Sequence, residues 1–153
     1  MIVAWRLIKA KRQATAFDGE GARQAGGRWN HQGTAVVYVS GSLALAALEA
    51  FVHLMRAASV IPHVTFRVEI PENIVTELQQ KDLPRNWRSE PPPDITKQIG
   101  TDWVAAAASA VLRIPSVIVP VEHNFVLNPV HPDFKKLNIS KPEPFSFDPR
   151  MWK

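Results

Sequence analysis

The sequence predicts a single α+β domain in which short strands are combined with a few short helices. Segments rich in β-branched and aromatic residues are bounded by glycine and proline, as strands are. Two further segments have the apolar spacing and the polar first residue that are typical of helices. At 153 residues the chain is long enough for one core, and no repeat or linker divides residues 1–153 into two domains.

The expected strands are spread along the whole chain. The first covers residues 2–8, which are apolar and largely β-branched or aromatic. The others are expected at residues 36–39, 64–70, 116–119, 124–127 and 134–139. The proline-rich tail from Lys141 is expected to pack as an extended arm or an edge strand.

A first helix is predicted over residues 42–58, with Ser40 or Ser42 as its N-cap. Four apolar side chains recur at helical spacing and predict one buried face: Leu45, Leu48, Val52 and Met55.

A second helix is expected in the alanine-rich residues 102–112, capped by Thr101 or Asp102. It should stop before Pro115. Residues 9–34 and 72–98 are expected to be irregular connections, each with one short helical turn.

Residues 26–49 join three elements whose chemistry is complementary. The turn Gly26-Gly27-Arg28-Trp29-Asn30-His31 is flexible, cationic and aromatic, and it leads through a strand into the helix that carries Glu49. A charge beside an apolar helix face is costly without a partner. Either His53, four residues later, pairs with Glu49, or Glu49 points into a pocket. We favour the pocket, because the glycine-rich turn before the helix also needs a function.

Several classes of protein are disfavoured. The chain has no cysteine, so a disulfide or a thiolate metal site is excluded, and its five histidines lack metal-ligand spacing. It has no phosphate-binding P-loop, no complete dinucleotide fingerprint and no nucleophile elbow. No apolar run is long enough for a membrane span, which predicts a cytoplasmic protein. The net charge of +4 includes a small cluster at Lys9, Lys11 and Arg12, which we interpret as solvated surface charge.

Six polar residues remain as candidates for a site, although each taken alone has an ordinary structural explanation. They are Arg6, Arg28, Tyr38, Glu49, Ser116 and Asn124.

With these residues the chain resembles the RES-domain toxins of bacterial toxin–antitoxin pairs, a family named for an arginine, a glutamate and a serine. The matching segments follow the expected order over nearly the whole chain, whereas residues 71–98 carry no matching motif. The segments are Trp5-Arg6-Leu7, Gly26-Gly27-Arg28-Trp29-Asn30, Val37-Tyr38, Ala47-Leu48-Glu49, residues 111–120, Glu122-His123-Asn124-Phe125 and residues 128–134.

The resemblance implies a fold related to the ADP-ribosyltransferases, with a mixed core and a split pair of sheets. It implies that NAD is the substrate, that no metal takes part, and that cleavage of the nicotinamide–ribose bond depletes NAD and arrests growth. Arg6 and Arg28 would then hold phosphates and Tyr38 would stack on nicotinamide. Glu49 would stabilise the transition state. Ser116 and Asn124 would shape the pocket, with Arg6, Glu49 and Ser116 as the catalytic set.

The resemblance also implies a cognate Xre-type antitoxin, through which any contact with DNA would be made, and it leaves a homodimer open. Two alternatives remain at this point. One is transfer of ADP-ribose to a protein or nucleotide target. The other is a binding module without catalysis, which docks nucleic acid through Lys9, Lys11, Arg12 and Arg23.

Overall fold

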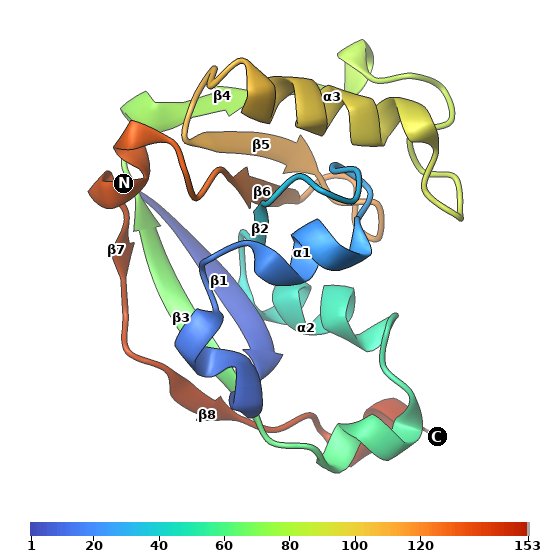
Figure 1. Ribbon diagram of the computed structural model, residues 1–153. Coiled ribbons are helices and arrows are strands. Elements are labelled where there is room, and N and C mark those ends of the chain that lie inside the picture. Colours follow the sequence, from blue (N-terminus) through green and yellow to red (C-terminus); the bar gives the residue numbers. More distant parts are fainter. Residues whose placement is uncertain (153) are drawn as a thin grey trace.

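The computed structural model describes residues 1–152 and contains one curled eight-stranded sheet with three short α-helices (Figure 1). The strands are β1 Ile2–Lys9, β2 Val37–Ser40, β3 His63–Ile70, β4 Val75–Glu77, β5 Val111–Pro115, β6 His123–Leu127, β7 Asn138–Ile139 and β8 Glu143–Phe145. The α-helices are α1 Glu20–Ala25, α2 Leu43–Phe51 and α3 Asp94–Ala105. The predicted α+β class is confirmed.

The sheet is split in the middle. Its order is β4-β5-β6-β2-β1-β3-β7, and β8 also pairs with β3. Strands β1 and β3 form eight residue pairs and β2 and β6 form four, whereas β1 and β2 are joined by the single pair Trp5–Ser40. Two well-paired halves are therefore joined through one residue pair, so the ladder between β1 and β2 is short.

The two faces of β2 bury different cores because successive side chains of a strand point to opposite sides. Val37 and Val39 pack with Ala4 and the apolar side chains of β3 and β6. Val36 and Tyr38 belong to a second cluster, which contains three tryptophans: Trp29, Trp87 and Trp103. The turn at residues 26–31 is thus anchored in the second core.

Four of the predicted strands are confirmed, because β1, β2, β3 and β6 lie within one or two residues of the expected ranges. The C-terminal tail supplies an edge strand, β8, as expected. Residues 9–34 contain α1 and also a 3-10 helix at Ala10–Thr15, one helical segment more than predicted.

No helix described in residues 1–152 combines the length and apolar character that crossing a membrane requires.

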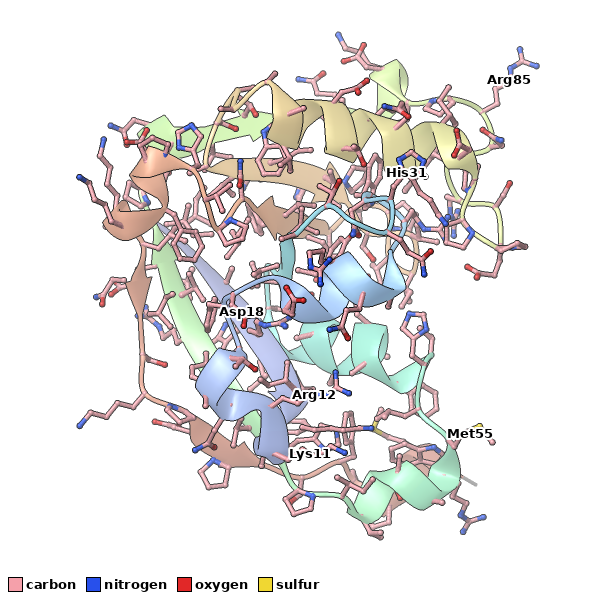
Figure 2. All side chains as sticks on the ribbon, in the orientation of Figure 1. Lys11, Arg12, Asp18, His31, Met55 and Arg85 are labelled. Carbon is pink, nitrogen blue, oxygen red and sulfur yellow. The ribbon has the colours of Figure 1, made fainter. Side chains whose placement is uncertain are left out.

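Helix α2 is shorter than predicted. Its N-cap is Ser42, whose side chain accepts a hydrogen bond from the Leu45 amide at 3.0 Å. Past Phe51 the amides of His53 and Leu54 bond three residues back, so the α-helical pattern ends, and Arg56–Val60 is a 3-10 helix. The predicted buried face is wrong beyond Leu45: Met55 is 78% exposed and points outward (Figure 2).

Helix α3 begins at Asp94, directly after the three prolines, and not at residue 102. Prolines are well suited to the start of a helix, whereas alanine content alone does not decide where a helix lies. The chain turns out of the helix at Ala107, which has φ +48°. Ala110 and Val111 are then fully buried, and β5 begins at Val111, so pairing in β5 overrides the helix propensity of the alanines.

One predicted strand is wrong and another is shorter than predicted, in both cases for local reasons. Residues 116–119 form a bend, because the Ser116 hydroxyl accepts hydrogen bonds from the amides of Ile118 and Val119 at 3.1 Å each. Within residues 134–139 only β7 is extended, since Pro132–Lys136 is a 3-10 helix capped by the His131 side chain. Strand β4, which pairs in parallel with β5, lies in a segment predicted to be irregular.

Gly100 fixes the distance between α3 and the turn at residues 26–31. A Cβ atom at this position would lie 1.7 Å from the Trp29 carbonyl oxygen, which is closer than any van der Waals contact allows. The lack of a side chain is therefore required for the turn to pack against the helix.

We predict that Gly100→Ala lowers the free energy of unfolding by about 3 kcal/mol or more, because backbone atoms must move to relieve the overlap. Urea denaturation of the purified protein measures the change. Gly21→Ala in α1 is the matched control, since a Cβ there meets only Arg12 Nη1 at 4.0 Å. The control should be neutral or stabilising by about 0.5–1 kcal/mol. Equal stability of both variants would contradict this account.

Candidate active site

Glu49 lies in the last turn of α2, and its carboxylate is bound from across the fold. Its Oε1 atom accepts hydrogen bonds from Ser116 Oγ at 2.8 Å and from Asn124 Nδ2 at 2.6 Å. Both bonds end on the same oxygen, so neither of them occupies Oε2. Glu49 is half-buried, which leaves its carboxylate held in one orientation with one oxygen still available.

Ser116 holds Glu49 and is itself held by the backbone. It is fully buried directly after β5, and its hydroxyl accepts the two amides of the following bend while it donates to Glu49. With one donated and two accepted hydrogen bonds, Oγ has used its bonding capacity. The geometry therefore makes Ser116 a residue that orients the carboxylate.

Asn124 holds Glu49 from the other side. It lies in β6 opposite Ser40, at the end of β2 where the two halves of the sheet meet. Its amide donates to Glu49, whereas its buried Oδ1 has no hydrogen-bond partner within residues 1–152. An unpaired buried acceptor is rare in proteins, and it is a good partner for a hydroxyl group of a ligand.

Arg6 bridges the split between the two halves of the sheet. Its Nε donates to the Ala16 carbonyl at 2.6 Å and its Nη1 donates to the Tyr38 carbonyl of β2 at 3.0 Å. Neither bond uses Nη2. Burial lowers the pKa of the Arg6 guanidinium to about 10, and the nearby carboxylate of Asp18 opposes this effect. Arg6 therefore stays charged at neutral pH where it bridges β1 and β2.

The Tyr38 hydroxyl connects β2 to the glycine-rich turn. It donates to Asn30 Oδ1 at 2.6 Å and accepts from the Trp29 amide at 3.1 Å. Asn30 is fully buried, and its Nδ2 donates to the carbonyls of Ala22, His31 and Thr34. Burial raises the pKa of the Tyr38 hydroxyl, so it remains a neutral donor. The turn is consequently rigid in spite of its glycines.

Arg28 is bound to the loop before α3. Its Nη1 donates to the carbonyls of Trp87 at 3.0 Å and Ser89 at 2.7 Å, and its Nη2 meets Glu90 at 2.8 Å. Its side chain is only 13% exposed, whereas the side chain of Glu90 is 74% exposed. None of these bonds uses Nε, so Arg28 keeps a donor for an anion while it is paired with Glu90.

The structure brings together some of the predicted residues. Glu49, Ser116 and Asn124 form one hydrogen-bonded cluster, and Arg6 meets Tyr38 through its backbone carbonyl. Arg28 makes its contacts elsewhere, at residues 87–90. The arrangement combines a fixed carboxylate, an unpaired amide oxygen and a buried cation, which suits a ligand with hydroxyl and anionic groups. Within residues 1–152, no three His, Asp or Glu side chains are grouped to hold a metal ion.

Sequence reasoning did not assign roles to Asn30 or His31. His31 contacts two residues of α3, with Nδ1 3.2 Å from Thr101 Oγ1 and Nε2 2.7 Å from Asp94 Oδ1, and Figure 2 shows it beside that helix. Both residues belong to the Gly-Gly-Arg-Trp-Asn-His turn, so this turn is the sequence feature from which their importance could have been predicted.

Comparison with known proteins gives consistent matches over the whole chain. A family model described as the RES domain matches residues 3–148. A protein of Yersinia enterocolitica named Toxin Res is 39% identical over 151 residues, which cover 98% of this chain and 99% of that protein. A Sphingobium protein named Prs ADP-ribosylating toxin is 37% identical over 152 residues, which cover 96% of this chain and 94% of that protein.

Among solved structures, the fold is similar to a chain of the M. tuberculosis MbcT–MbcA toxin–antitoxin complex, with a TM-score of 0.78. The match covers 98% of this chain and 86% of that chain at 15% sequence identity, so it shows a likeness of fold alone.

We predict that Tyr38→Phe lowers the free energy of unfolding by about 1–3 kcal/mol, because Asn30 Oδ1 and the Trp29 amide lose a buried partner. Urea denaturation again measures the change. Ser59→Ala is the control, since the Ser59 hydroxyl bonds the Arg56 carbonyl in an exposed turn and its loss should be close to neutral. A Tyr38→Phe variant as stable as the parent would show that the hydroxyl does not hold the turn.

Proposed function

Because this chain belongs to the RES domain family, we propose that it is a toxin of a toxin–antitoxin system that binds NAD and breaks its nicotinamide–ribose bond. The observation that carries the proposal is the carboxylate of Glu49, which Ser116 and Asn124 fix through a single oxygen. Relatives named as toxins, at up to 39% identity in these comparisons, support the class of function.

Glu49 is suited to the charge that develops during this reaction. When the bond from ribose C1′ to the nicotinamide nitrogen breaks, its electron pair leaves with nicotinamide and neutralises the pyridinium. Positive charge then appears on the ribose ring, as in glycoside cleavage. A carboxylate already oriented by two donors stabilises that charge without having to reorganise. Oε2, which neither donor occupies, would then face the ribose.

The other polar groups fit different parts of NAD. Asn124 Oδ1 lacks a partner within residues 1–152 and would accept a hydrogen bond from a ribose hydroxyl. Arg6 would meet the pyrophosphate through Nη2, since guanidinium groups match phosphate oxygens. Arg28 would do so through the donors that Glu90 and the two backbone carbonyls leave unused. Tyr38 would stack on nicotinamide through its ring face, because its hydroxyl is already engaged.

The acceptor of ADP-ribose is the main alternative within enzymes. Water, inorganic phosphate or a macromolecule would each complete the reaction after nicotinamide leaves. One relative carries the name Prs ADP-ribosylating toxin, which favours transfer to a protein as the second candidate. Mass spectrometry of the ribose product separates the three, since they give free ADP-ribose, its phosphate ester or a modified protein.

Binding of nucleic acid without catalysis has less support. Of the four cations of this hypothesis, Lys11 and Arg12 are exposed on the 3-10 helix after β1 (Figure 2), whereas Arg23 lies in α1 and pairs with Glu20. These cations do not form the continuous stripe that tracks a phosphate backbone.

We predict that the purified protein consumes NAD and releases nicotinamide, and that Glu49→Gln slows this turnover by about two to three orders of magnitude. The variant keeps the size of the side chain and an oxygen that can accept from Ser116 and Asn124. Chromatography of nicotinamide and NAD over time measures the rate, in buffers with and without phosphate. Glu72→Gln, which removes an exposed carboxylate, is the matched control and should turn over NAD at the parent rate.

A parent protein that leaves NAD intact in these buffers would overturn the proposed reaction. A folded Glu49→Gln variant with parent turnover would remove this residue from the mechanism and leave the reaction standing.

An enzyme that consumes NAD has to be restrained in its own cell, and we propose a protein antitoxin of Xre type as the inhibitor. It would cover the opening between the turn at residues 26–31 and Glu49, and it would make any contact with DNA. The similar fold found in a toxin–antitoxin complex supports such a partner.

We predict that expression of the parent chain alone arrests growth, and that expression with the neighbouring open reading frame restores it. Colony counts after induction measure both effects, with Glu49→Gln as the inactive control. Normal growth of cells that contain the folded parent protein at high level would contradict the toxin function.

A further inference from the structure

Arg113 lines a cavity whose walls are formed by residues outside the Glu49 cluster. The cavity has a volume of about 260 Å³ and is lined by Ile2, Val3, Gly41, Arg113, Val121, Glu122, His123 and Phe125. His123 and Phe125 flank Asn124 in β6, and successive side chains of a strand point to opposite faces. The cavity therefore lies on the face of β6 that points away from Asn124 and Glu49.

The guanidinium of Arg113 lacks the partner expected of a charge in this position. Its buried Nε has no hydrogen-bond partner within residues 1–152, and its charge is placed over the Phe125 ring at 5.4 Å. Glu77 pairs with Arg113 in the strand register, but its carboxylate meets His123 at 3.6 Å instead. A buried donor of a charged group that bonds to nothing is costly, which points to a missing anion.

The walls restrict which anion fits. Ile2, Val3 and Val121 offer apolar surface, so the ligand should carry an apolar body beside its charge. The carboxylate of Glu122 also lines the cavity and would repel a second negative charge. His123 adds no free cation, since Glu77 balances its charge when it is protonated. A guanidinium fork matches a planar carboxylate, which carries a single charge, better than a dianionic phosphate in these surroundings.

We propose that this cavity binds a small monocarboxylate, whose carboxylate meets Arg113 and whose apolar body lies against Ile2, Val3 and Val121. The site does not depend on NAD cleavage. The site gives a role to Arg113, which takes no part in the proposed reaction.

The test is a titration of the parent protein with hexanoate, followed by the ¹H–¹⁵N resonance of the Arg113 side-chain Nε–H. We expect a saturable shift of this resonance, and binding about ten- to a hundredfold weaker in Arg113→Met, which keeps much of the side-chain length but loses the charge. Arg67→Met is the matched control, because Arg67 lies exposed in β3 beside Glu69, and it should bind hexanoate like the parent.

Three further ligands complete the test. Hexan-1-ol should bind more weakly than hexanoate, inorganic phosphate should not compete with it, and NAD should not displace it. The absence of a saturable shift, equal binding of the alcohol, tighter binding of phosphate, displacement by NAD, or unchanged affinity in Arg113→Met would each overturn the proposal. If Arg113→Met does not fold, the shift in the parent protein and its competition by the three ligands decide the question.

Discussion

The arrangement of the site depends on the short ladder between the two central strands of the sheet, β1 and β2. Strands β1 and β2 share one residue pair, Trp5–Ser40, so backbone groups on either side of it must find other partners. Arg6 supplies one by donating to the Tyr38 carbonyl, and it reaches Ala16 with a second donor. A side chain thus replaces ladder hydrogen bonds between the two halves of the sheet.

The turn at residues 26–31 shows how a glycine-rich segment can be made rigid. Asn30 spends both hydrogens of its amide on backbone carbonyls and its oxygen on Tyr38, so the buried polar groups satisfy one another. Gly100 lets α3 approach the Trp29 carbonyl closely from outside. Such a network is stable only as a whole, because each group left unpaired in the interior is costly. Gly26 and Gly27 allow the backbone of the turn to adopt its conformation, and the hydrogen bonds of Asn30 hold it there.

The sequence allowed the strands with strong β-branched patterns to be predicted, but not the elements that tertiary contacts decide. Strands β1 and β3 were found because their composition is unambiguous, whereas β4 has three residues and exists through its pairing with β5. Alanines 105–108 favour a helix locally, and the burial of Ala110 and Val111 in the sheet ends it. The bend after Ser116 was not predicted, because the spacing of apolar residues does not reveal a hydroxyl that accepts hydrogen bonds from two backbone amides. Glu49 could be singled out as a charge in an apolar helix, and Ser116 and Asn124 were among the candidate residues. That both of them donate to the Glu49 carboxylate follows only from the structure. Arg113 was passed over, since nothing in the sequence tells a paired arginine from an unpaired one.

The separation along the chain between Glu49 and its donors has a consequence for synthesis. Ser116 is 67 residues away and Asn124 is 75 residues away, so both contacts close long loops. A growing chain on the ribosome holds a complete helix α2 long before it contains either donor. The carboxylate is therefore unconstrained in every nascent or prematurely ended chain that stops before Ser116, and it is fixed only once β6 has joined the sheet. The ordered cluster therefore forms only in chains in which residues 116–127 have been made and β6 has joined the sheet.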